Sequence, residues 1–383
     1  MSRVLLHDSG RSGKVGWAET AIRGRMAAGV VISPWQTPPT DMPRRPSAAT
    51  YRDVVRDAGG TVIWDPTTAG AHAPGSNDRD IYDLWSLWQP PGDPAVSDVA
   101  LQDHVDRCAQ HAHGLGVELL GPTIALDSPQ GQNAERAEDM AEQTLAALPG
   151  SGITIAGTQG FWTSGTPLDA YIGRLISLRP ARVNVVLVRP GIVYPPAGLT
   201  AAEVGGLCRS VHTLSLHSQV VVGHGDYAAL PAVVAGAALV GSGWDLRHRV
   251  FALDAFTNTT QGGGGTPPRV THAGLLGVLK RADAESLLAA DAPRSAALVP
   301  GSLPVGINGA WQHHLECLNA AVETLSAATT RSARATLLEG WYAAADAEFA
   351  QVDGLVGGLD TGAVEWIHAL RGGLALYVAE EGL

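Results

Sequence analysis

The segment 241–249, Gly-Ser-Gly-Trp-Asp-Leu-Arg-His-Arg, carries the densest set of residues able to bind and transform a ligand. Asp245 offers a carboxylate that could act as a nucleophile, Trp244 a flat stacking surface, and Arg247 forked donors for an anionic group. The two glycines let the backbone approach a ligand, because no Cβ stands in the way. We therefore expect Asp245 to be catalytic and Trp244 and Arg247 to bind the substrate. In the alternative, Asp245 caps a following helix and pairs with Arg249.

Other polar residues directly follow short apolar runs, as a site built at strand ends requires. Asp8 and Asp127 add carboxylates, and we predict that they are catalytic together with Asp245. Asp65-Pro66 also ends such a run, but we interpret Asp65 as a cap or turn residue, because a carboxylate can accept from free N–H groups. The same alternative stays open for Asp127. The further residues predicted to bind the substrate are His7, Trp35, Gln159, Arg189, His224 and Asp226.

No metal site is predicted. His7, Asp8, His224 and Asp226 could in principle form a mixed histidine–carboxylate site. Metal-dependent barrel hydrolases, however, typically begin with a His-x-His pair, and residues 7–9 read His-Asp-Ser. The sequence also lacks the Gly-x-x-x-x-Gly-Lys-[Ser/Thr] and Gly-x-Ser-x-Gly patterns, which argues against a P-loop ATPase and an α/β-hydrolase. We predict no cofactor.

The remaining histidine pairs and the cysteines are interpreted as structural. His111 and His113 stand late in a predicted helix, where cationic side chains favour the negative end of the dipole. His313 and His314 have no histidine at i+4, so we interpret them as part of a polar helix face. The three cysteines are far apart and outside any Cys-x-x-Cys spacing. They predict neither disulfides nor structural zinc, and they favour a cytoplasmic location.

Eight short apolar runs alternate with helix-compatible stretches over residues 1–260. Strands that alternate with helices pair in parallel, and continuously apolar strands are covered on both faces. Eight such units in about 250 residues match a (β/α)8 TIM-type barrel. An open doubly wound sheet is the alternative, but residues 8–13 do not supply its Gly-x-Gly-x-x-Gly turn. The runs are Arg3–Leu6, Gly29–Ile32, Thr61–Trp64, Val117–Leu126, Ile153–Ala156, Val183–Val188, Gln219–Val222 and Ala238–Val240.

The pattern changes at residues 261–268, Gln-Gly-Gly-Gly-Gly-Thr-Pro-Pro, which we predict to be a linker. Residues 269–383 are predicted to form a small helical C-terminal region. Within it, Trp311, Leu315 and Leu318 begin one apolar helix face. We expect this region to pack on the barrel, on a second copy of the chain or on a protein partner.

The composition excludes some classes of protein. The 383 residues are 45% hydrophobic and 16% charged, which does not fit a disordered chain. The near-apolar stretch Ala228–Val240 is too short to span a bilayer, so no membrane association is expected. A net charge of −11 does not support nucleic-acid binding. Only Lys14 and Lys280 are lysines among the 26 basic residues, so a local arginine-rich groove stays open.

Three short strings resemble tRNA-guanine transglycosylases. Residues 5–10, Leu-Leu-His-Asp-Ser-Gly, resemble that family's strand ending in Asp-Ser-Gly. Residues 155–160, Ile-Ala-Gly-Thr-Gln-Gly, are similar to its strand ending in Gln-Gly. Residues 222–226, Val-Gly-His-Gly-Asp, look like its Gly-Val-Gly strand, which a helix and the strand of the nucleophile follow.

The resemblance implies that Asp8 and Asp127 face a guanine-like base and that Gln159 reads its carbonyl edge. It also implies a nucleophilic Asp245, which would attack the ribose anomeric carbon and form a covalent sugar–enzyme intermediate. Gly241, four residues earlier, stands where the family's nucleophile would align, and the family's cysteine-rich zinc region has no counterpart here.

We therefore expect a TIM-barrel enzyme, of the glycosyl-transfer or hydrolysis type, that acts on a polar small molecule at its strand ends. A nucleoside- or base-containing ligand fits this expectation. Two alternatives remain open at this point. One is transglycosylase-type base exchange on nucleic acid, and the other is a barrel without turnover that serves as a recognition subunit.

Overall fold

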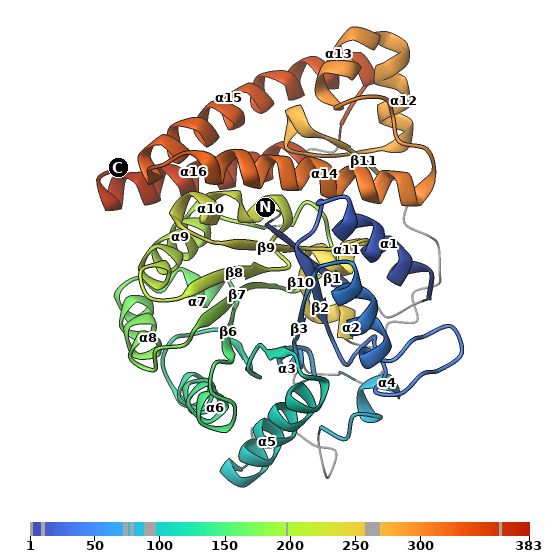
Figure 1. Ribbon diagram of the computed structural model, residues 1–383. Coiled ribbons are helices and arrows are strands. Elements are labelled where there is room, and N and C mark those ends of the chain that lie inside the picture. The colour runs from blue at the N-terminus through green and yellow to red at the C-terminus, as the bar shows by residue number, and fades with distance from the viewer. Residues whose placement is uncertain are drawn as a thin grey trace.

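The computed structural model describes residues 3–8, 12–71, 76, 80–87, 97–196, 198–256, 269–359 and 362–383. A curled parallel sheet with its surrounding helices occupies the described chain as far as Phe256. A C-terminal region begins at Arg269 and forms a layer of helices along one side of the sheet (Figure 1). The predicted linker, residues 261–268, lies outside the described residues.

Nine strands form the curled sheet in the order β4-β3-β2-β1-β9-β8-β7-β6-β5, and the short strand β10 pairs with β7. All of these pairings are parallel, which confirms the predicted α/β class. The pairing gives a half-barrel and does not establish a closed (β/α)8 barrel. The strands are β1 (Val4–Asp8), β2 (Gly29–Ile32), β3 (Thr61–Trp64), β4 (Glu118–Leu119), β5 (Ala125–Leu126), β6 (Gly152–Gly157), β7 (Arg182–Arg189), β8 (Gln219–Gly223), β9 (Leu239–Ser242) and β10 (Phe251–Ala252).

The predicted strand over 117–126 is wrong as a single strand, because it divides into β4 and β5. Gly121 and Pro122 interrupt it, and a proline has no N–H to donate to a neighbouring strand. Leu120 forms an isolated parallel bridge to Gly152, the first residue of β6. The two ends of the strand path therefore lie in one short segment of chain.

The helices around the sheet begin where capping side chains are available. Ser47, Ser97 and Thr200 each accept a hydrogen bond from a main-chain N–H of the helix that follows. No described helix is both long and apolar enough to cross a bilayer. These helices are α1 (Ser12–Arg23), α2 (Ala48–Asp57), α3 (Thr68–Ala71), α4 (Asp80–Asp83), α5 (Asp98–Leu115), α6 (Gln132–Ala147), α7 (Gln159–Trp162), α8 (Thr166–Ser177), α9 (Ala201–Ser215), α10 (Leu230–Ala235) and α11 (Leu246–Arg249).

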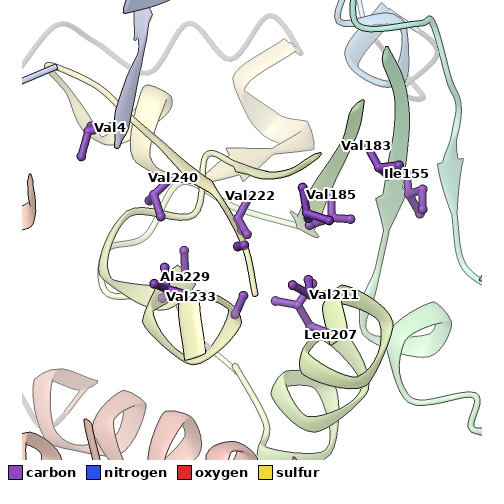
Figure 2. Packing of buried hydrophobic residues seen from close by; sticks show 14 of the residues in the cluster. Val4, Ile155, Val183, Val185, Leu207, Val211, Val222, Ala229, Val233 and Val240 are labelled. Carbon is purple, nitrogen blue, oxygen red and sulfur yellow. The ribbon is translucent and has the colours of Figure 1, made fainter. Parts of the chain in front are cut away.

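The main core lies between the sheet and its outer helices. Figure 2 shows valines of adjacent strands, Val185 and Val222 among them, facing Leu207 and Val211 of α9. All four side chains are buried. Because the strands are covered by helices, their apolar runs are continuous rather than alternating.

The C-terminal region contains a β-hairpin that the prediction of an all-helical region missed. Strands β11 (Arg269–His272) and β12 (Gly277–Lys280) pair antiparallel, and Leu276 adopts a left-handed conformation in the turn between them. The apolar periodicity that predicts helices begins only at Trp311, so it gave no information on residues 269–280, where the turn at Leu276 allows a hairpin. The helices that follow are α12 (Arg281–Ala290), α13 (Ala292–Leu298), α14 (Gly306–Ala327), α15 (Arg331–Val356) and α16 (Gly362–Glu381).

Helix α16 lies directly against α9 (Figure 1). Gly205 of α9 faces Leu376 and Gly373 of α16, and a Cβ at Gly373 would overlap the side chain of Val204. The absence of a side chain at both glycines lets the two helix backbones approach closely. The C-terminal region therefore shares a tightly packed interface with the helical layer of the sheet.

Candidate functional site

Two predicted binding residues, His7 and His224, stack face to face where the parallel strands end. His7 lies in β1 and His224 directly follows β8; their ring centroids are 3.7 Å apart and their planes differ by 21°. Gly241 of β9, the strand between β1 and β8, makes room for this pair. A Cβ there would lie inside van der Waals contact of His7 Nε2 and of the main-chain nitrogen of His224. Gly241 thus permits the approach of two protein groups.

The hydrogen bonds of the two rings fix where their protons lie. The main-chain N–H of His224 donates to Nε2 of His7 across 3.1 Å, so a neutral His7 carries its proton on Nδ1. Nδ1 of His224 donates to the carbonyl oxygen of His248 across 3.1 Å, so Nε2 of His224 keeps a lone pair. Neither His7 Nδ1 nor His224 Nε2 bonds to a described residue. The pair therefore presents one N–H donor and one acceptor.

Burial keeps both rings uncharged. Desolvation, together with His224 and His248, holds the pKa of His7 well below its usual value. Desolvation and His248 lower the pKa of His224 to about 3. At neutral pH both imidazoles are therefore neutral.

His248 joins the site from α11 and was not predicted as a site residue. Its Nε2 lies 3.1 Å from Oε1 of Gln36, and its Nδ1 lies 3.3 Å from Oδ1 of Asp245. Burial lowers its pKa to about 4, although the charge of Asp245 opposes the shift. A Cβ at Gly243 would overlap His248, so the second glycine of segment 241–249 also serves packing within the protein.

Both carboxylate oxygens of Asp245, which we predict to be catalytic, have partners within the protein. Its Oδ1 accepts from the main-chain N–H of Arg247 and so caps α11, and its Oδ2 lies 3.1 Å from Nζ of Lys14. Burial opposes the charged form, but His248 and Lys14 outweigh it and lower the pKa of the carboxyl. The side chain of Arg247, predicted to bind the substrate, is exposed. Arg249 donates to the carbonyl of Gly243 instead of pairing with Asp245.

Asp226, a predicted binding residue, is fully buried in a network of donors. Its Oδ1 accepts from Tyr194 Oη across 2.7 Å and from the main-chain N–H of Tyr227 across 2.8 Å. Its Oδ2 accepts from Ser242 Oγ across 2.5 Å and from His314 Nε2 across 2.8 Å. Burial opposes the charged form, but these partners hold the pKa of the carboxyl below its usual value. Asp226 is thus a structural anchor rather than a group open to a ligand.

The turn that carries His224 and Asp226 has an uncommon backbone. His224 has φ 52° and Asp226 has φ 47°, which places both in the left-handed region. This region is disfavoured for residues with a side chain, although Asp, Asn and His occupy it more often than most. Such strain persists only where surrounding contacts hold it, and the Asp226 network supplies them.

His314 was interpreted as part of a polar helix face, and that interpretation is wrong. His313 and His314 are buried, because α14 packs against β1 and β11. Nδ1 of His314 bonds to Thr271 Oγ1 across 2.8 Å, while its Nε2 reaches Asp226. The signal in the sequence was the position of His314, three residues after Trp311 and four before Leu318, on the apolar face of the helix.

A cavity lies at the same edge of the sheet, on the side of β3 and β6. Asp65 lines it, and Phe251 both lines it and contacts the ring of His224 at a centroid separation of 5.4 Å. Asp65 is 8% exposed, and burial raises its pKa to about 6. The sequence alone favours a cap or turn role for Asp65 over a role in the site. Its Oδ1 does accept from the main-chain N–H of Thr67, so the local pattern fits a turn and a site equally well.

The other predicted binding residues are distributed around the edge. Trp35 packs between Tyr82 and Phe256, with centroid separations of 5.1 and 5.0 Å. Arg189 is buried in an ion pair with Glu203, at 2.5 Å between Nη1 and Oε1.

Trp244 is fully buried and lies beside Trp17 and Trp311, so neither of its faces is available for stacking on a ligand. Asp127 and Gln159 are exposed at the ends of β5 and β6, where Asp127 accepts from Thr158 Oγ1. They lie several strands from the histidine pair. The side chain of Asp8 is outside the described part of the structure.

Metal-binding residues do not gather in the part of the chain that the structure describes. There, no group of three or more His, Cys, Asp or Glu side chains is placed to hold an ion. All three cysteines are free and buried.

Comparison of the chain with protein-family models and with curated proteins gives no match.

Proposed function

We propose that the chain is a (β/α)8-barrel enzyme that carries out acid–base chemistry on a small, polar, uncharged molecule at the carboxyl edge of its strands. The observation that carries the proposal is the stacked, neutral pair of His7 and His224, with one N–H and one lone pair left for a ligand. A nucleoside- or base-containing molecule is a substrate of this kind.

The barrel part of the proposal is supported by the segment between β4 and β5. The main-chain N–H of Leu120 donates to Trp64 O in β3, and that of Gly121 donates to Gly152 O in β6. Two consecutive residues thus bond to β3 near one end of the strand path and to β6 near the other. These bonds fit a single fourth barrel strand, made of β4 and β5 and interrupted at Pro122. When β4 and β5 count as one strand, the sheet has as many strand positions as a TIM-type barrel.

An uncharged substrate is supported by the pairing of the buried cations near this edge. Lys14 pairs with Asp245, Arg189 with Glu203, and Arg249 lies 3.8 Å from the Asp226 carboxylate. A phosphate or carboxylate buried at this edge would have to compete with these carboxylates for the buried cations. A neutral imidazole N–H suits a carbonyl oxygen, because it can donate a hydrogen bond to the negative charge that develops on that oxygen in the transition state.

The proposal is tested by a turnover screen with a matched pair of variants. Esters, amides, glycosides and nucleosides would be incubated with the full chain and followed by proton NMR. His224→Asn removes the imidazole, and asparagine tolerates the left-handed backbone at this position. His368→Asn is the control, because that histidine is exposed on α16 and bonds only to Asp346 among the described residues.

We expect His224→Asn to slow turnover by about 100-fold or more, the usual effect of removing an acid–base group, and His368→Asn to leave it unchanged. Full turnover by a folded His224→Asn protein would refute the assignment. A second measurement needs no substrate: long-range 1H–15N spectra should find both His7 and His224 protonated on Nδ1. Protonation of either ring on Nε2 would contradict the stated hydrogen bonds.

A further inference from the structure

The cavity beside the histidine pair has a mixed wall, in which four threonines and Asp65 lie among small apolar residues and Phe251. Its wall comes from the turn after β3 and α3, from β6 and β7, from the β4–β5 break and from β10. Among the described residues that line it, none is basic and Asp65 is the single acidic one. The lining residues are Asp65, Thr67, Thr68, Ala69, Gly121, Thr123, Thr154, Ala156, Val186 and Phe251.

Asp65 is held rigidly at this wall. Its Oδ1 accepts from the main-chain N–H of Thr67 across 2.7 Å, and Thr67 Oγ1 donates to the carbonyl of Asp65. Ser33 Oγ lies 2.7 Å from Thr67 Oγ1 and links the turn to the loop after β2. Thr67 itself is left-handed, with φ 54°. The carboxyl group is therefore fixed in direction before any ligand arrives.

Thr154 supplies an unsatisfied polar atom to the same cavity. Its Oγ1 is buried and bonds to no described residue. The hydroxyls of Thr68 and Thr123 already have partners, which are His104 Nε2 and the carbonyl of Ile124. A buried hydroxyl normally finds a partner, either in the protein or in an ordered water molecule. The cavity is narrow, with room for about one water molecule.

We infer that this cavity binds a water molecule between the Asp65 carboxyl group and the Thr154 hydroxyl, and that this water is the nucleophile of a hydrolytic reaction. The inference rests on the proposed function, because it assigns the reaction type to the same edge of the sheet. Phe251, which lines the cavity and contacts His224, connects the two groups of residues.

The proton balance of the step follows from the groups present. The water oxygen forms a bond to the electrophilic carbon of an acyl or glycosyl substrate, and Asp65 accepts a proton from that water. The bond from this carbon to the leaving atom breaks. The leaving atom takes the electron pair and the proton that Asp65 accepted, so Asp65 returns to its carboxylate form. A carboxyl group with a pKa of about 6 is ionised at neutral pH and still basic enough to take a proton in the transition state.

The water site is tested with water itself as the probe. Oxygen-17 relaxation dispersion counts long-lived buried water molecules, and a high-resolution crystal structure locates them. We expect a water within hydrogen-bond distance of Asp65 and Thr154, and the loss of one long-lived water in Thr154→Val. Thr144→Val is the control, because Thr144 is buried in α6 and bonds to Met140 O, outside the cavity. A dry cavity in the wild-type protein would overturn the inference.

The hydrolytic role is tested with p-nitrophenyl acetate as the probe substrate. We expect Asp65→Asn to slow its hydrolysis by about 100-fold, and Asp103→Asn, an exposed change on α5, to leave it unaltered. The wild-type rate should rise with pH through an inflection near 6, which the Asp65→Asn protein should lack. A rate and pH profile unchanged in Asp65→Asn would refute the hydrolytic role. The proposed acid–base function would survive that result if His224→Asn still abolished turnover in the screen.

Discussion

His314 Nε2 lies 2.8 Å from Asp226 Oδ2, so a histidine of α14 completes the hydrogen bonding of a carboxylate at the end of β8. Both side chains are buried. His224, two residues before Asp226, stacks on His7. The C-terminal region is therefore bonded to the turn that carries the candidate site, in addition to its apolar packing on the helices.

Replacing Asp226 should destabilise the protein strongly. Asp226→Asn keeps the shape and tolerates the left-handed backbone, but it places an amide N–H against partners that themselves donate. We expect the free energy of unfolding to fall by about 3 kcal/mol, as for other buried charged groups that lose their partners. Urea denaturation at pH 7 measures this change. Asp346→Asn, which breaks only an exposed contact with His368, should leave the midpoint nearly unchanged, and equal midpoints for the two variants would contradict the anchoring role.

The histidine stack should depend on the missing side chain at position 241. Gly241→Ala puts a methyl group where the His7 ring and the main-chain nitrogen of His224 now lie. We expect the stack to separate, the protein to lose about 1–3 kcal/mol of stability, and turnover in the screen to fall with it. Gly16→Ala in α1 is the control, because a Cβ there meets nothing within 4 Å and alanine favours the helix. An unchanged stack in a crystal structure of Gly241→Ala would show that the glycine is not required.

Asp65 should reduce stability at neutral pH. Its pKa is about 6 in the folded protein against 3.8 ordinarily, so the unfolded chain loses this proton first as pH rises. The buried Asp65 carboxylate therefore does not lower the free energy of unfolding below about pH 4. The loss grows between pH 4 and 6 and then stays constant at about 3 kcal/mol or less. Asp65→Asn keeps the acceptor for Thr67 and removes the charge. We expect it to be more stable than wild type at pH 7.5 and equal to it at pH 4; a variant less stable at pH 7.5 would count against the raised pKa.

His224 should contribute to acid instability with the opposite pH dependence. Its pKa is about 3 in the folded protein against 6.5 ordinarily, so only the unfolded chain binds the proton between these values. The contribution of neutral His224 to the free energy of unfolding is therefore complete above pH 6.5. It decreases by about 1.4 kcal/mol per pH unit as the pH falls from 6.5 toward 3. His224→Asn should flatten the fall in urea midpoint between pH 6.5 and 4.5. An identical slope in wild type and variant would show that His224 protonates freely in the folded state.

The class of the fold and part of the site could be predicted because they depend on local patterns. Apolar β-branched runs that alternate with amphipathic stretches predict parallel strands and their helices. Parallel pairing brings the ends of β1 and β8 to one edge, so His7 and His224 could be predicted to lie together. The break at Pro122 was also visible in the sequence, but its effect on the strand could not be judged without knowing which neighbours the segment bonds.

The rest of the site depends on contacts between distant segments. Asp226 and His314 are 88 residues apart in the sequence, and nothing local to His314 indicates its partner. Trp244 has the side chain of a stacking platform, but Trp17 and Trp311 cover it from two other helices. The pKa of Asp65 is raised by burial, which arises only when the strands and helices around the cavity are assembled. The sequence therefore shows which chemical groups the protein contains, but it does not show whether a ligand can reach them.

The close packing of α16 on α9 has a consequence for the synthesis of the protein. The ribosome releases residues 201–215 of α9 long before residues 362–381 of α16, and until then the surface around Gly205 has no cover. An apolar helix face left open on a nascent chain is prone to aggregate or to bind a chaperone. The sheet can begin to form during translation, but its outer layer on this side closes only when α16 emerges.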